Sequence, residues 1–123
     1  MGKRIIMVVD DDSITQKIVR TALEKGAFDV VAVEDGTKAV EIARGVKPDA
    51  ILLDRIMPDI DGNDVLRALK ATVATAEIPV IMLTSMGAGH DISESLELGA
   101  RDYIVKPFDP DTLGMRLSKA LRR

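Results

Sequence analysis

Five short apolar runs alternate with segments of helical period, and this alternation limits the fold more than any other feature of the chain. The runs cover residues 5–9, 30–33, 50–53, 80–83 and 103–105. The first and fourth are apolar throughout, which is typical of strands that are covered on both faces in a parallel sheet. Apolar residues at three- and four-residue spacing follow each run, so the sequence predicts five strands that alternate with five helices.

Helix-start signals support this division. Ser13 and Gln16 fit a capping box, and Pro110 suits the first turn of the last helix. Right-handed crossovers would place the helices on both faces of the sheet. We therefore expect an α/β fold, a (βα)5 doubly wound five-stranded parallel sheet of the flavodoxin-like kind. The strand order 2-1-3-4-5 is taken from that group of sheets. In the first helix, one apolar face is expected to hold Ile14, Ile18, Val19, Ala22 and Leu23.

Length and composition narrow the function. The 123 residues fit one domain, 1–123, with a core of ordinary size. A net charge of −3 argues against direct binding of nucleic acid, which depends on a positive surface. The chain has no cysteine, which is compatible with a cytoplasmic protein and excludes thiolate chemistry. The first apolar run is too short to span a membrane, so no membrane partner is expected.

Polar side chains follow the apolar runs where the strands would end. Asp10 and Asp11 follow the first run, Asp54 the third, Thr84 the fourth and Lys106 the fifth. The carboxyl ends of parallel strands lie at one edge of the sheet. In this strand order the first and third strands are neighbours, so we expect the three carboxylates to converge where the strand order reverses.

Such a group of side chains has a specific chemistry. Carboxylates held close together repel one another, and a hard divalent cation with oxygen ligands, such as Mg²⁺, relieves the repulsion. A nearby lysine pairs with phosphoryl charge, and a threonine hydroxyl donates one more hydrogen bond. Carboxylate, metal, lysine and hydroxyl together are the parts needed to form an aspartyl phosphate.

Four stretches together resemble the receiver domain of two-component response regulators over nearly the whole chain. They are residues 6–11 (IMVVDD), 51–62 (ILLDRIMPDIDG), 79–85 (PVIMLTS) and 99–108 (GARDYIVKPF). The resemblance implies that Asp54 is the phosphoacceptor, which takes its phosphoryl group from a histidine kinase or a histidine phosphotransfer protein. It implies that Asp11, Asp54 and the backbone carbonyl of Ile56 bind Mg²⁺ directly, and that Asp10 holds the metal mainly through water.

The resemblance also implies a switch. Lys106 would pair with the phosphoryl group and Thr84 would hydrogen-bond to it. Thr84 moving inward would let Tyr103 leave an exposed rotamer for a buried one. The surface of the fourth helix, fifth strand and fifth helix would then control a partner protein, or an effector domain absent from this chain, as a monomer or a phosphorylation-dependent dimer. Such a domain catalyses only its own phosphorylation and dephosphorylation. The Lys106–Pro107 peptide bond would be cis.

Three positions depart from the commonest receiver pattern. Arg55 places a cation directly after the phosphoacceptor, where an apolar or small residue is more usual. Ile56 and Met86, two positions after Asp54 and Thr84, are apolar at sites where the family tunes its dephosphorylation rate. By resemblance they cannot position an attacking water, so we predict a slowly decaying phosphoryl group.

Two other functions fit parts of the pattern. The spacing of Asp10 and Asp12 resembles the nucleophile and general acid of haloacid-dehalogenase-type phosphatases, although that interpretation leaves Asp54 unexplained. Taken alone, Asp12 is expected to serve the start of the first helix. The other alternative is a receiver that no longer needs phosphate and works as a binding module. The presence of all five expected site residues argues against this loss of function.

Overall fold

The computed structural model describes residues 2–122 and contains the predicted alternation of strands and helices. In chain order the elements are β1 (Arg4–Val9), α1 (Ser13–Glu24), β2 (Phe28–Val33), a short 3₁₀ helix (Gly36–Lys38), α2 (Ala39–Val46), β3 (Ala50–Leu53), α3 (Gly62–Ala71), β4 (Val80–Thr84), α4 (Gly89–Glu97), β5 (Asp102–Val105) and α5 (Pro110–Leu121). The predicted strands lie within these bounds, and β3 has the predicted limits.

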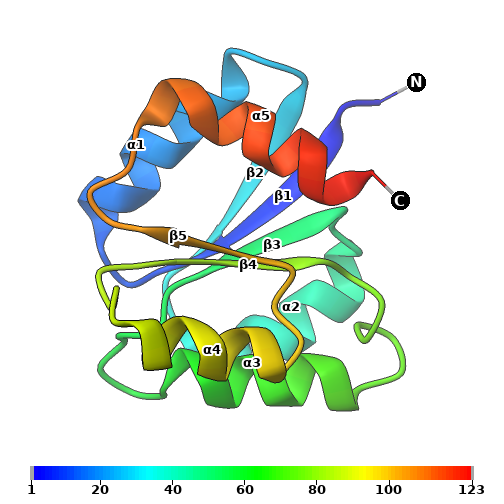
Figure 1. Cartoon of the computed structure of the whole chain (residues 1–123). Helices are drawn as coiled ribbons and strands as arrows, with labels where there is room; N and C mark the ends of the chain where they lie inside the picture. The colour runs from blue at the N-terminus through cyan, green and yellow to red at the C-terminus, as the bar shows by residue number, and fades with distance from the viewer. Residues whose placement is uncertain (1, 123) are drawn as a thin grey trace.

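The strands form one parallel sheet in the order β2-β1-β3-β4-β5, which confirms the predicted fold class and topology. The helices α1 and α5 cover one face, and α2, α3 and α4 cover the other (Figure 1). This arrangement explains why residues 6–9, 50–53 and 80–83 of the central strands are all apolar and buried, because each side chain points into one of two helix-covered layers.

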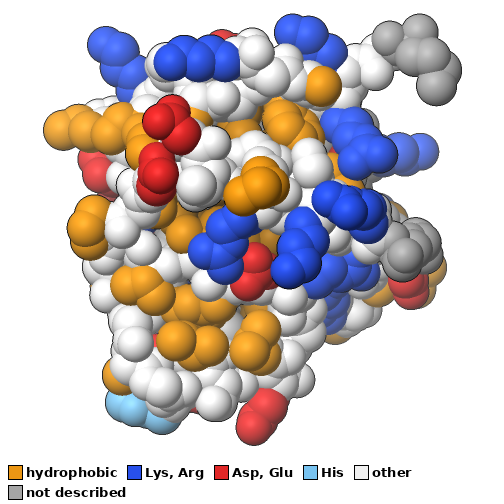
Figure 2. Space-filling view, turned by 45° about the horizontal axis from the view of Figure 1, so that its top comes forward, with side chains coloured by type: hydrophobic (Ala, Val, Ile, Leu, Met, Phe, Trp, Pro, Cys, Tyr) orange, Lys and Arg blue, Asp and Glu red, His pale blue; other side chains and the backbone are white. Residues whose placement is uncertain are grey.

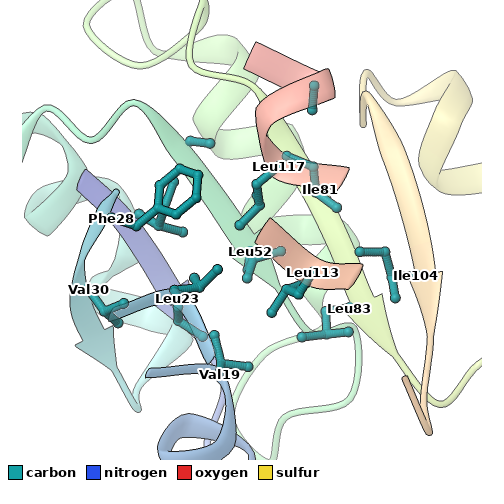
Figure 3. Packing of buried hydrophobic residues seen from close by; sticks show 14 residues of the cluster. Val19, Leu23, Phe28, Val30, Leu52, Ile81, Leu83, Ile104, Leu113 and Leu117 are labelled. Atoms are coloured by element: carbon teal, nitrogen blue, oxygen red, sulfur yellow. The ribbon is translucent and has the colours of Figure 1, made fainter. Parts of the chain in front are cut away.

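Each layer has its own aliphatic core. Between the sheet and the α1–α5 pair, Leu23, Leu113 and Leu117 pack against Leu52 and Ile81, all buried (Figure 3). The second core lies under α2, α3 and α4 and includes the buried side chains Leu53, Leu66, Leu69, Met82 and Tyr103. Burial of a leucine-sized side chain contributes about 1.5–3 kcal/mol, so these two layers fix the strands that carry the site.

The start of α1 differs from the prediction. Asp12, rather than Ser13, is the N-cap: its carboxylate accepts hydrogen bonds from the Ile14 backbone N–H (3.1 Å) and the Thr15 hydroxyl (2.8 Å). These two bonds lower the pKa of the Asp12 carboxyl. The predicted capping box is therefore wrong, whereas the expected place of Asp12 at the helix start is confirmed.

The buried face of α1 is also rotated from the predicted one. Ile14 and Ile18 are 68% and 42% exposed, whereas Gln16 is 7% exposed. The Gln16 side-chain amide donates to the backbone carbonyls of Val8, Asp10 and Val33. A buried carbonyl without a donor is costly, so a polar side chain occupies a position that hydrophobic periodicity assigns to an apolar one.

Two further predicted features have clear outcomes. The Lys106–Pro107 peptide bond is cis, as the resemblance implied. Pro110 stands in the first turn of α5, and Asp109 before it accepts a hydrogen bond from the Asp111 N–H as the N-cap. Among residues 2–122, no helix combines the length and apolar composition needed to cross a membrane.

Candidate functional site: an acidic cluster at the carboxyl edge of the sheet

Backbone hydrogen bonds at the ends of the strands fix the positions of three predicted site residues. The N–H of Asp10 donates to Val33 in β2, and the N–H of Asp54 donates to Val9 in β1, both at 3.0 Å. On the other side of the sheet, the Lys106 N–H donates to the Thr84 carbonyl at 2.8 Å. The sheet ladder therefore continues one residue past each strand and fixes where these side chains start.

Three carboxylates meet at this edge, as predicted. One carboxylate oxygen from each of Asp10, Asp11 and Asp54 lies within 4.8 Å of the others. Asp10 and Asp54 are buried and Asp11 is exposed, so the cluster opens to solvent on one side. The structure therefore brings together acids from the ends of β1 and β3, the neighbouring strands at the reversal of strand order.

Lys106 reaches across from the end of β5 and joins two of these acids. Its Nζ donates to Asp10 Oδ2 at 2.9 Å and to Asp54 Oδ2 at 3.0 Å. Burial raises the pKa of the Asp10 carboxyl, and the hydrogen bond from Lys106 only partly offsets this effect. Burial opposes the charge on Lys106, but the bonds to Asp10 and Asp54 outweigh it and raise the pKa of the ammonium group. Lys106 therefore stays protonated and neutralises part of the buried negative charge.

The carboxylate oxygens of the cluster suit a hard cation as ligands. Backbone N–H groups fix the inner oxygens: Asp12 donates to Asp10 Oδ1 at 2.9 Å, and Ile56 donates to Asp54 Oδ1 at 3.1 Å. The ligand set is entirely oxygen, partly exposed and rich in negative charge, which is what Mg²⁺ requires. The residues therefore fit this metal. The part assigned to the Ile56 carbonyl stays a prediction.

Thr84 and Tyr103 lie on the side of the site toward α4. Thr84 is fully buried at the end of β4, and its hydroxyl accepts a bond from the Met86 N–H at 3.4 Å. Tyr103 is 8% exposed, and its hydroxyl donates to the Met86 carbonyl. The tyrosine therefore occupies the buried position of the expected switch here, not the exposed one.

Two structural contributions were not foreseen from the sequence. A Cβ on Gly62 would lie 2.1 Å from the Asp54 carbonyl oxygen and 2.5 Å from Arg55 Cα, so only glycine fits there. Arg55, noted only as unusual, is 7% exposed, and its guanidinium group donates to the Asp91 backbone carbonyl in α4. The sequence does show a glycine at the end of the loop that follows residues 50–53, and a cation directly after Asp54. Neither signal says which atoms the residue would contact.

Comparisons with known proteins agree with this geometry. The family model described as response regulator receiver domain matches residues 6–118. The chain is 39% identical over its full length to a probable transcriptional regulator, ycf27, of Porphyridium aerugineum, and 40% identical over 96% of its length to the DNA-binding response regulator MtrA of Mycobacterium leprae. It covers 50% and 51% of those two proteins, so it spans about half the length of the curated relatives it matches.

Solved structures give the same result. The activated N-terminal receiver domain of Klebsiella pneumoniae RstA is 35% identical, with a TM-score of 0.90 over 98% of this chain and 100% of that one. A putative response regulator from Chloroflexus aurantiacus has a TM-score of 0.93 at 29% identity, over 99% of this chain and 100% of that one. The capping role of Asp12 and these matches leave the phosphatase alternative without support. The chain belongs to the response regulator receiver domain family of two-component systems.

Proposed function

We propose that Asp54 is the phosphoacceptor of this receiver domain. The single observation that carries the proposal is the position of Lys106 Nζ, 3.0 Å from Asp54 Oδ2 and 2.9 Å from Asp10 Oδ2, beside the three-carboxylate cluster. An ammonium group and a cation site on either side of one carboxylate can compensate the charge of an incoming phosphoryl group. Lys106 bonds both acids, and the receiver pattern, in which the acid after the third strand accepts the phosphoryl group, favours Asp54 rather than Asp10 as the nucleophile.

The proposed reaction is a phosphoryl transfer from a phosphohistidine of a histidine kinase or histidine phosphotransfer protein. An Asp54 carboxylate oxygen forms a bond to phosphorus while the phosphorus–nitrogen bond breaks. The electron pair of that bond remains on the histidine nitrogen, which takes up a proton. Asp10, Asp11 and Asp54 would hold Mg²⁺, which supplies charge compensation to the phosphoryl oxygens when bound. Lys106 pairs with the remaining charge and Thr84 donates a hydrogen bond.

The proposal includes an output surface on α4, β5 and α5. One part is basic, with Arg101, Arg116 and Lys119 around a groove of about 540 Å³, and Arg116 pairs with Asp102 at 3.0 Å. The space-filling view shows Lys and Arg side chains gathered beside a group of hydrophobic ones (Figure 2). A surface with both kinds of side chain suits a protein partner, as a monomer or a phosphorylation-dependent dimer.

Several relatives are named as DNA-binding regulators. We propose that this chain itself makes no direct contact with nucleic acid, because its net charge is −3, and that it acts on a protein target or a joined effector domain. We propose that the phosphoryl transfer takes place in the cytoplasm, a compartment compatible with a sequence that lacks cysteine.

A slow loss of phosphate is part of the proposal. Ile56 and Met86 line the same shallow depression beside the site, with a volume of about 390 Å³. Neither side chain has a hydrogen-bond donor or a strong acceptor to position an attacking water. We expect the aspartyl phosphate to persist well beyond seconds at neutral pH with Mg²⁺ and no phosphatase. Decay within seconds, followed by intact-protein mass, would contradict this expectation.

The experiment that tests the phosphoacceptor uses acetyl phosphate and Mg²⁺. We expect wild type to gain the mass of one phosphoryl group, and Asp54→Asn to gain none. Asp64→Asn, which changes an exposed acid on α3, serves as the matched control and should label like wild type. Label that survives in Asp54→Asn but disappears in Asp10→Asn would assign the nucleophile to Asp10. No label on wild type and no response to Mg²⁺ would favour a phosphate-independent binding module.

A further inference from the structure

Helix α4 contacts the domain with an unusually polar face. Its two buried residues are Asp91 and Ser95, which are 8% and 0% exposed, whereas its Leu96 is 44% exposed. A surface helix ordinarily buries an apolar stripe. In α4, only the half-buried Ile92 packs against the nearby core from within the helix. Polar contacts must therefore supply much of what positions this helix.

Those contacts lead back to the segment that follows Asp54. Arg55 Nη1 donates to the Asp91 backbone carbonyl at 3.3 Å, and it lies 3.6 Å from a carboxylate oxygen of Asp91 and 3.6 Å from one of Glu94. The Ser95 hydroxyl donates to the side-chain carbonyl of Asn63, in the first turn of α3, at 2.8 Å. Helix α4 is thus tied to both ends of the loop that follows the phosphoacceptor.

Arg55 also acts on Tyr103. Burial raises the pKa of the Tyr103 hydroxyl, and the positive charge of Arg55 acts in the opposite direction. That hydroxyl donates to the Met86 carbonyl in the loop before α4. The guanidinium group that pairs with the acids of α4 therefore also influences the buried tyrosine. Its Nε lies 4.0 Å from Asp61 Oδ1 and is buried without a hydrogen-bond partner among residues 2–122.

Loss of this cation would leave α4 in an unfavourable position. Asp91 has a side chain only 11% exposed, and apart from Arg55 its carboxylate has the His90 Nε2 at 3.3 Å, on a side chain that is 79% exposed. Removing one partner of a buried ion pair leaves a charge that needs hydration. Without Arg55, we expect α4 to move outward until water reaches Asp91, and such a movement would open the space around Tyr103.

We propose that Arg55 is a positioning residue that holds α4 against the loop after Asp54 and keeps Tyr103 buried before any phosphate is added. The inference rests on the proposed switch. It assigns to Arg55 the position that α4 and Tyr103 have in the unphosphorylated protein. A receiver with Arg55 begins with its tyrosine inward, so phosphorylation changes the environment of Tyr103 less than it would without the arginine.

The chain provides its own probe for a test. Tyr103 is its one tyrosine and it has no tryptophan, so emission excited on the long-wavelength side of the tyrosine band, where its two phenylalanines do not absorb, reports this residue alone. In unphosphorylated wild type we expect weak quenching by acrylamide. Arg55→Met should raise the quenching constant several-fold, and Arg55→Lys should restore it in part. Arg67→Met, which removes an exposed arginine paired with Asp64 on α3, is the matched control and should behave like wild type.

The partner side gives a second, independent variant. The double substitution Asp91→Asn with Glu94→Gln removes the acids but leaves Arg55, and it should also raise the quenching of Tyr103. This variant decides the question if Arg55→Met fails to fold, as judged by circular dichroism. Wild-type tyrosine that is already freely quenched would overturn the inference. So would a folded Arg55→Met, or the folded double variant in its place, with Tyr103 as protected as in wild type.

Addition of Mg²⁺ and beryllofluoride separates the two proposals. If both hold, the reagent returns Tyr103 of Arg55→Met to its protected state while changing wild type little. If Arg55→Met exposes Tyr103 but beryllofluoride alters neither protein, the positioning role stands and the phosphoacceptor proposal fails. If beryllofluoride binds both proteins but Tyr103 is equally protected in both beforehand, the phosphoacceptor proposal stands and the role of Arg55 is refuted.

Discussion

Substitution of Gly62 by alanine should damage the site more than its small size suggests. The added Cβ would lie 2.1 Å from the Asp54 carbonyl oxygen, 2.5 Å from Arg55 Cα and 2.8 Å from the Asp54 carbonyl carbon. All three atoms are backbone, in the segment whose Arg55 carbonyl accepts a bond from the Gly62 N–H at 2.9 Å. No flexible side chain is available to move aside, so the start of α3 and the Asp54–Arg55 segment must separate.

The expected cost follows from that rigidity. Overpacking in a well-packed region costs about 1–3 kcal/mol, and contact with backbone places this substitution at about 3 kcal/mol or more. A domain of this size has a total stability of roughly 5–15 kcal/mol, so the loss is a large fraction of it. Displacement of Asp54 should also weaken the proposed Mg²⁺ site, so any stabilisation that Mg²⁺ gives by binding to the folded state should shrink.

Gly45→Ala provides the matched control, because the same substitution is expected there to change the free energy of unfolding in the opposite direction. It lies in α2, and a Cβ there would meet nothing within 4 Å. Alanine in a helix is more favourable than glycine by about 0.5–1 kcal/mol, so Gly45→Ala should raise stability slightly.

Urea unfolding followed by far-ultraviolet circular dichroism measures both effects, with and without Mg²⁺. We expect the midpoint to fall for Gly62→Ala and to rise a little for Gly45→Ala, with unchanged slopes. The reasoning would be refuted by a Gly62→Ala protein that unfolds at the wild-type midpoint and is still stabilised by Mg²⁺ to the wild-type extent. A large loss for Gly45→Ala would show that any added methyl group is harmful.

Two further predictions concern charge. Lys106→Met removes the cation shared by Asp10 and Asp54, and since the lysine side chain is 20% exposed the free energy of unfolding should fall by about 3 kcal/mol, the low end for a broken buried pair. Urea unfolding should show Mg²⁺ restoring part of this loss, and an unchanged midpoint would count against the shared-cation role. Tyr103 should titrate above the ordinary tyrosine pKa of about 10, because burial raises it. The stability linked to the neutral hydroxyl is therefore complete below about pH 10 and is lost as the pH rises through the folded-state pKa. Tyrosinate absorbance would follow the titration, and unfolding curves would follow the loss of stability. A titration midpoint at or below about pH 10 would contradict the burial of Tyr103.

The sequence predicted the fold well because each strand is buried on both faces. A run such as 80–83 leaves no doubt about its environment, and the parallel pairing that follows places the strand ends on one edge. The convergence of Asp10, Asp11, Asp54 and Lys106 is then a consequence of topology. This part of the site depends only on where strands stop, which the sequence marks clearly.

Periodicity failed where polar side chains serve the backbone. Gln16 turns inward to bond carbonyls of both β1 and β2, and α1 rotates so that Ile14 and Ile18 face solvent. Hydrophobic spacing cannot predict such a helix face, because the carbonyl groups that need a hydrogen-bond donor lie elsewhere in the sequence. The contact of Gly62 with the backbone of Asp54 was hidden for a related reason: it depends on how a loop folds back on its own start.

Consecutive residues divide the two tasks of this domain. Asp54 bonds Lys106 at the cluster, whereas Arg55, one peptide unit later, bonds α4 and acts on Tyr103. Gly62 packs against the Asp54–Arg55 backbone, so this unit has little freedom to move alone. On the proposed function, a displacement of Asp54 toward a phosphoryl group would carry Arg55 with it. Coupling between chemistry and the α4 surface needs no long chain of contacts here, because the same peptide unit supplies both.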